Sequence, residues 1–270
     1  VHADSGIDVQ EFLITPVKRD SFRDGLEKIA NIYHTLKKIL SDKGLETAVG
    51  DEGGFAPKLG STENAIATLY QAIESAGYVP GEEIAIAIDP ASSEFYDDKE
   101  KVYRFEGQNL TSKELLTYYE NLVEKYPALI SIEDGFSEHD WEGFAAQTKA
   151  QGQKIQLVGD DIFVTNPQIF KEGIKKDVAN AILIKLNQIG TVTEAIEAIS
   201  LARKAGYKTM ISHRSGETVD SYIADFAVAM HAGQIKTGSM ARSERVEKYN
   251  QFLRIEEDLG KDVALAKFPG

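Results

Sequence analysis

Charged side chains able to do acid–base or metal chemistry follow the apolar segments of this chain in regular order. In residues 181–187, four apolar residues precede Lys185 and are typical of a strand buried on both faces. A lysine beside a core pairs with a carboxylate, extends to water along its apolar stem, or shifts its pKa toward the neutral amine. Other segments repeat the pattern, which favours chemistry over simple solvation. The groups assigned to these strand ends are Glu11, Glu52, Asp89, Glu133, Asp160, Lys185, His213, Arg214 and Lys236.

Three of these groups, Asp89, Glu133 and Asp160, are expected to end consecutive strands and so to lie side by side. Bare carboxylates held together repel one another and raise one another's pKa. Oxygen ligands with room for water suit a hard cation, and we expect Mg²⁺. The alternative is that each of them caps a helix, because aspartate is a common N-cap residue. For three in succession, the metal site is the favoured interpretation.

Cationic side chains are expected opposite this cluster, which predicts an anionic substrate that bridges both. Arg214 and Ser215 suit a phosphate, because a guanidinium offers paired donors and a hydroxyl adds another. Lys185, near other cations in an apolar strand, is expected to be partly neutral and to act as a base. Glu52, in a tight turn flanked by glycines, is the opposing acid. These residues predict metal-assisted proton abstraction next to a carboxylate, which is the chemistry of a lyase.

The elements that must position these side chains alternate along the chain. We expect strands over residues 8–14, 47–50, 84–88, 129–132, 155–159, 181–184, 209–212 and 234–237. The expected helices are 22–40, 62–76 (N-capped by Thr62), 111–125 (with a capping box from Thr111 to Glu114), 141–150, 167–175, 194–205, 222–231 and 244–259. Strict alternation implies parallel strands, and eight units predict one closed TIM-type (β/α)₈ barrel over residues 1–270, of the α/β class. Residues 95–105 are expected to form an inserted surface hairpin.

Composition excludes several classes of protein. The chain has 43 acidic and 30 basic residues, a formal charge of -13, which opposes nucleic-acid binding. No apolar run approaches the length of a membrane span, so we expect no membrane insertion. The absence of cysteine excludes disulfides and fits a reducing cytoplasm, and the five histidines lack the spacing of a zinc site. Residues 1–3 do not resemble a signal peptide or a natural start.

Six motifs, in order and covering nearly the whole chain, resemble those of the enolase family. They are residues 50–57, 131–134, 159–161, 185–190, 212–217 and 233–238. The resemblance implies reversible, Mg²⁺-dependent dehydration of 2-phosphoglycerate, a small phosphorylated hydroxy acid, to phosphoenolpyruvate in glycolysis. A lysine or histidine base working with Mg²⁺ is general in the enolase superfamily.

The resemblance also implies a role for each residue that matches a motif. Lys185 is the base that removes the C2 proton, Glu52 is the acid at the C3 hydroxyl, and Glu11 is its partner. The implied metal ligands are Asp89, Glu133 and Asp160. Asp161 is similar to a group that supports these ligands. The implied substrate contacts are Gln10, Arg214, Ser215 and Lys236, with catalytic His213 and the substrate contact His2 beside the reacting centre.

The pattern departs from the enolase family at its amino-terminal side, where the resemblance implies a smaller domain that is absent from this sequence. In the family that domain supplies a mobile loop, a serine ligand for a second Mg²⁺ and part of the dimer contact. We therefore expect the barrel by itself to have low activity, and its parent to be a cytoplasmic homodimer or higher homo-oligomer with a secondary presence at the cell surface. Two alternatives stay open, another lyase or racemase of the enolase superfamily and a non-catalytic binding scaffold.

Overall fold

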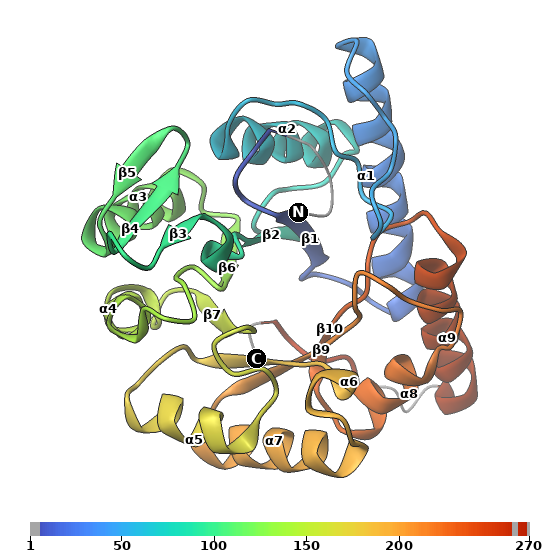
Figure 1. Ribbon diagram of the computed structural model, residues 1–270. Coiled ribbons are helices and arrows are strands. Elements are labelled where there is room, and N and C mark those ends of the chain that lie inside the picture. The colour runs from blue at the N-terminus through green and yellow to red at the C-terminus, as the bar shows by residue number, and fades with distance from the viewer. Residues whose placement is uncertain (1–5, 261–263, 269–270) are drawn as a thin grey trace.

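The computed structural model describes residues 6–260 and 264–268, and its centre is a curled sheet of seven strands. The strands surround the middle of the molecule and most helices lie outside them (Figure 1). The inner strands are almost completely buried, as expected for a sheet covered by helices. In spatial order the strands are β1 (Glu11–Pro16), β2 (Ile84–Asp89), β6 (Leu129–Glu133), β7 (Gln156–Gly159), β8 (Ala181–Ile184), β9 (Lys208–Ser212) and β10 (Gly233–Lys236).

The first strand runs opposite to the others. β1 pairs antiparallel with β2, placing Glu11 opposite Asp89, whereas the remaining neighbours in this sheet are parallel. The expectation of parallel strands throughout is therefore wrong for β1. The reversal has a functional consequence, because it brings the amino end of β1 to the edge where the other strands have their carboxyl ends.

Helices connect the parallel strands, as the alternation predicts. The helices are α1 (Phe22–Asp42), α2 (Thr62–Ser75), α3 (Ser112–Lys125), α4 (Trp141–Gln151), α5 (Pro167–Lys175), α6 (Leu186–Ile189), α7 (Val192–Ala205), α8 (Tyr222–Ala229) and α9 (Ser243–Leu259). The capping box of Thr111 and Glu114 at the start of α3 is confirmed. For α2 the N-cap is Ser61, and Thr62 is the first helical residue. No helix among the described residues has both the length and the apolar character needed to cross a membrane.

Residues 47–50 do not form the expected strand. Val49 makes only an isolated bridge to Phe55, and the Gly50 amide donates to the Gly54 carbonyl at 2.8 Å, so the segment folds back on itself. The backbone of this short apolar run forms its hydrogen bonds within its own turn, and the run does not join the sheet. The described part of the barrel therefore has seven strands instead of the eight expected, and β1 and β10 are its two edges.

The inserted segment is larger than the expected hairpin. It contains a short 3₁₀ helix, η1 (Ser92–Phe95), and an antiparallel sheet of β3 (Tyr96–Asp97), β4 (Val102–Phe105) and β5 (Gln108–Leu110). The second turn, at residues 106–107, has positive φ at both positions, and so a third strand can pair. Buried aromatic rings of the insertion pack toward the barrel, with Tyr103 and Phe136 at 5.7 Å between ring centroids.

Candidate active site

A cleft of about 210 Å³ lies at the edge where the parallel strands end. Most of the residues singled out from the sequence line it. They are Gln10, Glu11, Glu52, Asp89, Asp160, Lys185, His213, Arg214, Ser215 and Lys236. Glu133 does not line the cleft but is buried and contacts Lys236. His2 lies outside the described residues.

Each of these side chains owes its position to the end of an element. Asp89 and Glu133 are the last residues of β2 and β6, and Lys236 is the last residue of β10. Glu11 is different, because it begins β1 and reaches the cleft only through the reversed direction of that strand. The interpretation of Glu11 as a residue at a strand's carboxyl end is therefore wrong, although its inclusion in the site agrees with the structure.

Lys236 is the centre of the densest charge cluster. Its Nζ lies 3.0 Å from Glu11 Oε2, 3.0 Å from Asp89 Oδ2 and 2.7 Å from Glu133 Oε1. Burial by itself lowers the pKa of Lys236, but the charges of Asp89, Glu11 and Glu133 outweigh it, so this pKa is held well above its usual range. The lysine is therefore a fixed positive charge inside the barrel.

Burial also shifts the carboxylates that face Lys236. It raises the pKa of Glu11 to about 8, because desolvation and the neighbouring Asp89 and Glu52 outweigh the attraction of Lys236. Desolvation and Asp89 likewise raise the pKa of Glu133 well above its usual range. The lysine does not neutralise the whole group, so the cluster still favours a proton or another cation.

A second carboxylate group lies beside the first. One oxygen each from Asp134, Asp160 and Asp161 lies within 4.8 Å of the others. Asp134 adopts a positive φ of 41°, and its carboxylate accepts the backbone N–H groups of Asp160 at 2.9 Å and Asp161 at 2.8 Å. Because its two oxygens bind these amides, Asp134 fixes the loop after β7. Burial and the charge of Asp160 raise the pKa of Asp161 to about 6.

The grouped carboxylates of Asp134, Asp160 and Asp161 suit a hard divalent cation, whereas the expected ligands Asp89 and Glu133 face Lys236. Asp160 Oδ1 is buried and has no hydrogen-bond partner among the described residues, and an anionic oxygen left in this state is costly. Ligands made only of carboxylate oxygens suit Mg²⁺ better than a softer metal. The alternative that these carboxylates cap helices is wrong, since the N-caps of the nearest helices are Ala91, Asp140 and Asn166.

Lys185 extends from the end of β8 into the cleft and pairs with Asp160 Oδ2. Burial lowers the pKa of Lys185, but the charge of Asp160 and the hydrogen bond to it outweigh burial, so the net direction is upward. The expectation of a partly neutral Lys185 is therefore wrong for the chain by itself.

His213 and Glu52 face each other across the cleft. His213 is 2% exposed, and its Nε2 lies 3.5 Å from Glu52 Oε2. Burial lowers the pKa of His213, and Lys236 and Arg245 lower it further, against the opposing effect of Glu52. The imidazole is therefore neutral near pH 7. Its neighbours at the rim, Arg214 and Ser215, line the cleft, and the Arg214 guanidinium donates to Asn187 Oδ1 at 2.8 Å.

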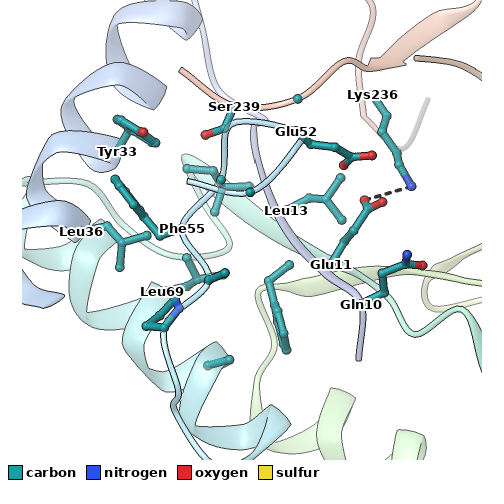
Figure 2. A pocket seen from close by; sticks show the side chains of 18 of the residues that line it. Gln10, Glu11, Leu13, Tyr33, Leu36, Glu52, Phe55, Leu69, Lys236 and Ser239 are labelled. Carbon is teal, nitrogen blue, oxygen red and sulfur yellow. Dashed lines mark ion pairs between the residues drawn. The ribbon is translucent and has the colours of Figure 1, made fainter. Parts of the chain in front are cut away.

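A larger cavity of about 320 Å³ adjoins the cleft on the side of β1, α1 and α2. Figure 2 shows its polar end, where Glu11 points toward Lys236 and Glu52 lies close by. Its other walls are apolar and include Leu13, Phe55 and Leu69 (Figure 2). The polar end of this cavity and the cleft share Glu11, Glu52 and Lys236, so solvent in the cavity reaches the charged cluster.

Three buried groups around the site were not predicted as site residues. Asp134 belongs to one of the recognised motifs, but its amide contacts depend on the path of a distant loop. Arg245 and Lys248 lie one turn apart on α9 and are fully buried. Their only sequence signal is two cations on one face of a helix, a pattern that most exposed helices share.

Comparisons with known proteins give the family of the chain. The family model described as "Enolase, C-terminal TIM barrel domain" matches residues 1–268. Over the whole chain, the sequence is 97% identical to Enolase 2 of Lactococcus lactis subsp. lactis (strain IL1403) and 91% identical to the enolase of Streptococcus thermophilus. It is 95% identical over 259 residues to Enolase 1 of Lactococcus lactis subsp. cremoris (strain SK11). The chain spans 64% of the length of the first two relatives and 62% of the third.

Proposed function

This chain belongs to the family of enolase C-terminal TIM barrel domains, and from that premise we propose that its cleft carries the chemistry of a phosphopyruvate hydratase. The reaction is the reversible dehydration of 2-phosphoglycerate to phosphoenolpyruvate, catalysed by a carbon–oxygen lyase. The observation that supports it best is the pairing of two lysines with separate carboxylates in one cleft, the buried Lys236 with the Glu11 cluster and the half-buried Lys185 with Asp160. Similarity to relatives named enolase disfavours a different lyase or racemase and a non-catalytic scaffold.

We propose that Mg²⁺ is held by Asp89, Glu133 and Asp160. When bound there, it supplies positive charge that stabilises the negative charge developing on the substrate carboxylate. The unpartnered Oδ1 of Asp160 supports this assignment. The raised pKa of Glu133 supports it as well, because a cation is a better partner for that buried carboxylate than a proton.

In the dehydration direction, Lys185 Nζ, released as the neutral amine when Asp160 engages another cation, accepts the proton from C2 of the substrate. The electron pair of that C–H bond forms the C2–C3 double bond, and the C3–O bond breaks. Glu52 gives a proton to the departing hydroxyl, which leaves as water. Glu11 supports Glu52, since its raised pKa keeps a proton beside that carboxyl group near neutral pH.

The remaining residues bind and orient the substrate. Lys236, held as a cation by its three carboxylates, offsets the charge on the substrate carboxylate. Arg214 and Ser215 at the rim suit the phosphate. Gln10 contributes an amide beside Glu11, and His213 orients the Glu52 side of the site; His2, outside the described residues, is a further proposed contact.

Exchange of the C2 hydrogen of 2-phosphoglycerate with solvent tests the base directly. The chain in ²H₂O is followed by ¹H NMR with and without Mg²⁺. We expect Mg²⁺-dependent loss of the C2 signal in the parent chain and none in Lys185→Ala. Lys175→Ala is the matched control, since Lys175 is an exposed lysine paired with Glu172 on α5.

The result that contradicts the proposal is exchange of equal rate in Lys185→Ala and the parent, because the proton would then be taken by another group. Exchange in the parent without turnover would show that the chain assembles the proton-abstraction step but not the loss of water. We further propose that the protein acts in the cytoplasm, as the absence of cysteine suggests, and that it assembles as a homodimer or higher homo-oligomer.

A further inference from the structure

Arg245, in the first turn of α9, is fully buried and directed at the loops that carry the site. Its Nη1 lies 2.6 Å from His213 Nδ1 and donates to the Arg214 carbonyl at 2.7 Å. Its Nη2 donates to the carbonyls of Asp51 at 3.1 Å and Ser215 at 2.7 Å. One guanidinium therefore connects the Glu52 turn, the 213–215 loop and the imidazole of His213.

The contact with His213 determines which ring nitrogen carries the proton. A guanidinium is always protonated in proteins and has no acceptor. Nδ1 of His213 must therefore accept from Arg245, and in the neutral ring the proton lies on Nε2. That nitrogen is the one 3.5 Å from Glu52 Oε2. Arg245 thus presents an N–H of His213 to the carboxylate proposed as the acid.

The surrounding packing leaves Arg245 little freedom. A Cβ placed on Gly238 would lie 2.6 Å from Arg245 Cδ and 2.7 Å from the Glu52 carbonyl, so the three segments are in close contact. The Ser239 amide donates to the same Glu52 carbonyl at 2.8 Å. The side chain of Arg245 is therefore closely packed on the way to His213, which limits how far its guanidinium can move from the imidazole.

We propose that Arg245 is a positioning residue that fixes the Nε2–H tautomer of His213 and aims it at Glu52. Its effect on catalysis rests on the proposed function, whereas the tautomer is a property of the chain itself. The charged groups that face His213 come from three elements and are Glu52 in the 50–54 turn, Lys236 of β10 and Arg245 of α9.

The tautomer is measured by ¹H–¹⁵N long-range correlation NMR of the ¹⁵N-labelled chain, with the His213 ring assigned from its loss in His213→Gln. We expect the Nε2–H pattern in the parent chain and a shift toward mixed tautomers in Arg245→Met. Lys248→Met is the matched control, because it removes the other buried cation of α9 without touching the imidazole; it should keep the Nε2–H pattern. Arg245→Lys, which retains a donor, should restore part of it.

An Nδ1–H tautomer in the parent chain would overturn the proposal, and so would an unchanged Nε2–H pattern in a folded Arg245→Met. If Arg245→Met does not fold, the parent spectrum and Arg245→Lys still decide between the two tautomers. Where the parent dehydrates 2-phosphoglycerate, Arg245→Lys should lower kcat by about 100-fold, the typical cost of a misplaced catalytic group, with a small change in KM. Arg254→Met, an exposed arginine on the same helix, is the activity control. Absence of both turnover and C2 exchange in the parent would contradict the proposed function, and the NMR result stands independently.

Discussion

Lys236 shows how a single residue organises the site. Three carboxylates from three strands meet its ammonium within 3.0 Å, and each would be a costly buried charge without it. The lysine thus has two uses: it holds the strand ends together, and it presents a permanent positive charge to an anionic substrate.

Replacing Lys236 by methionine should lower the free energy of unfolding by about 3–5 kcal/mol, because it leaves buried carboxylates without their partner. Thermal unfolding measures the loss, and Mg²⁺ should recover part of it by taking over the charge of Asp89 and Glu133. Lys175→Met, an exposed pair on α5, should cost about 0–1 kcal/mol. Equal losses in the two variants would show that the cluster contributes no more than a surface pair.

The lowered pKa of His213 predicts how the stability of the chain changes with pH. Burial lowers the pKa of this imidazole in the folded chain, so between that pKa and about 6.5 the unfolded chain binds more protons than the folded chain. Stability should therefore fall as the pH falls below about 6.5. Denaturant unfolding from pH 7.5 to pH 5 should show a smaller loss in His213→Gln than in the parent, and the opposite order would contradict a lowered pKa.

Among the elements, the turn at residues 50–54 is the one that aims the proposed acid. Gly53 has a φ of 80°, and a Cβ there would lie 2.3 Å from the Ala241 carbonyl oxygen. Gly54 has a negative φ and no atom within 4 Å of such a Cβ. The two adjacent glycines of one motif therefore have different requirements, which their sequence does not reveal.

Gly53→Ala should displace the turn and Glu52 with it. We expect a loss of about 1–3 kcal/mol of stability from the strained backbone and a larger fall in kcat than in KM, measured by urea unfolding and by the dehydration assay. Gly54→Ala is the matched control and should change both only slightly. If the two variants lose activity equally, the close approach to Ala241 does not determine the position of Glu52.

Helix α9 holds the loop at residues 213–218 in place. Lys248 donates to the Thr218 carbonyl at 2.5 Å and pairs with Glu217 at 2.9 Å, while Glu217 accepts the Arg214 amide at 2.9 Å. With Arg245 one turn earlier, the helix fixes both ends of the 213–218 loop. An element distant in sequence from most of the cleft thus positions the rim that we propose to bind the phosphate.

At the scale of the whole molecule, the described sheet curls without joining its two edges, β1 and β10. The cavity beside β1 reaches Glu11, Glu52 and Lys236 (Figure 2). Water near these groups weakens their electrostatic interactions with a substrate and competes for the transferred protons. This water affects the proposed cation binding less. The carboxylates involved lie at the ends of β2, β6 and β7, and each of these strands pairs with a neighbour on both sides.

We therefore predict that this chain of 270 residues binds Mg²⁺ but turns over 2-phosphoglycerate much more slowly than the full-length enolase of Streptococcus thermophilus, its 91% identical relative. Mg²⁺ at 100 times its Kd should add about 2.7 kcal/mol of stability, measured by thermal unfolding, and Asp160→Asn should abolish most of that gain. Turnover equal to that of the relative would contradict the prediction.

The sequence by itself determined most of the local structure and most of the residues that share the cleft. Periodicity located nearly every helix and strand, because apolar spacing and caps such as Thr111 act between residues a few positions apart. The recurrence of reactive groups after apolar runs correctly grouped residues of one cleft, since parallel strands share an edge. Where local signals were short, as in residues 47–50, the expectation failed.

Only the tertiary structure decided the direction of β1, the direction of the pKa shift of Lys185 and the contacts of Arg245. Each depends on a contact between residues far apart in the chain, such as Lys236 and Asp89, which are separated by 147 positions. A pKa depends on burial and on neighbouring charges, and a tautomer depends on a single donor. These properties depend on which residues are in contact in the folded chain, so a pattern along the sequence could not predict them.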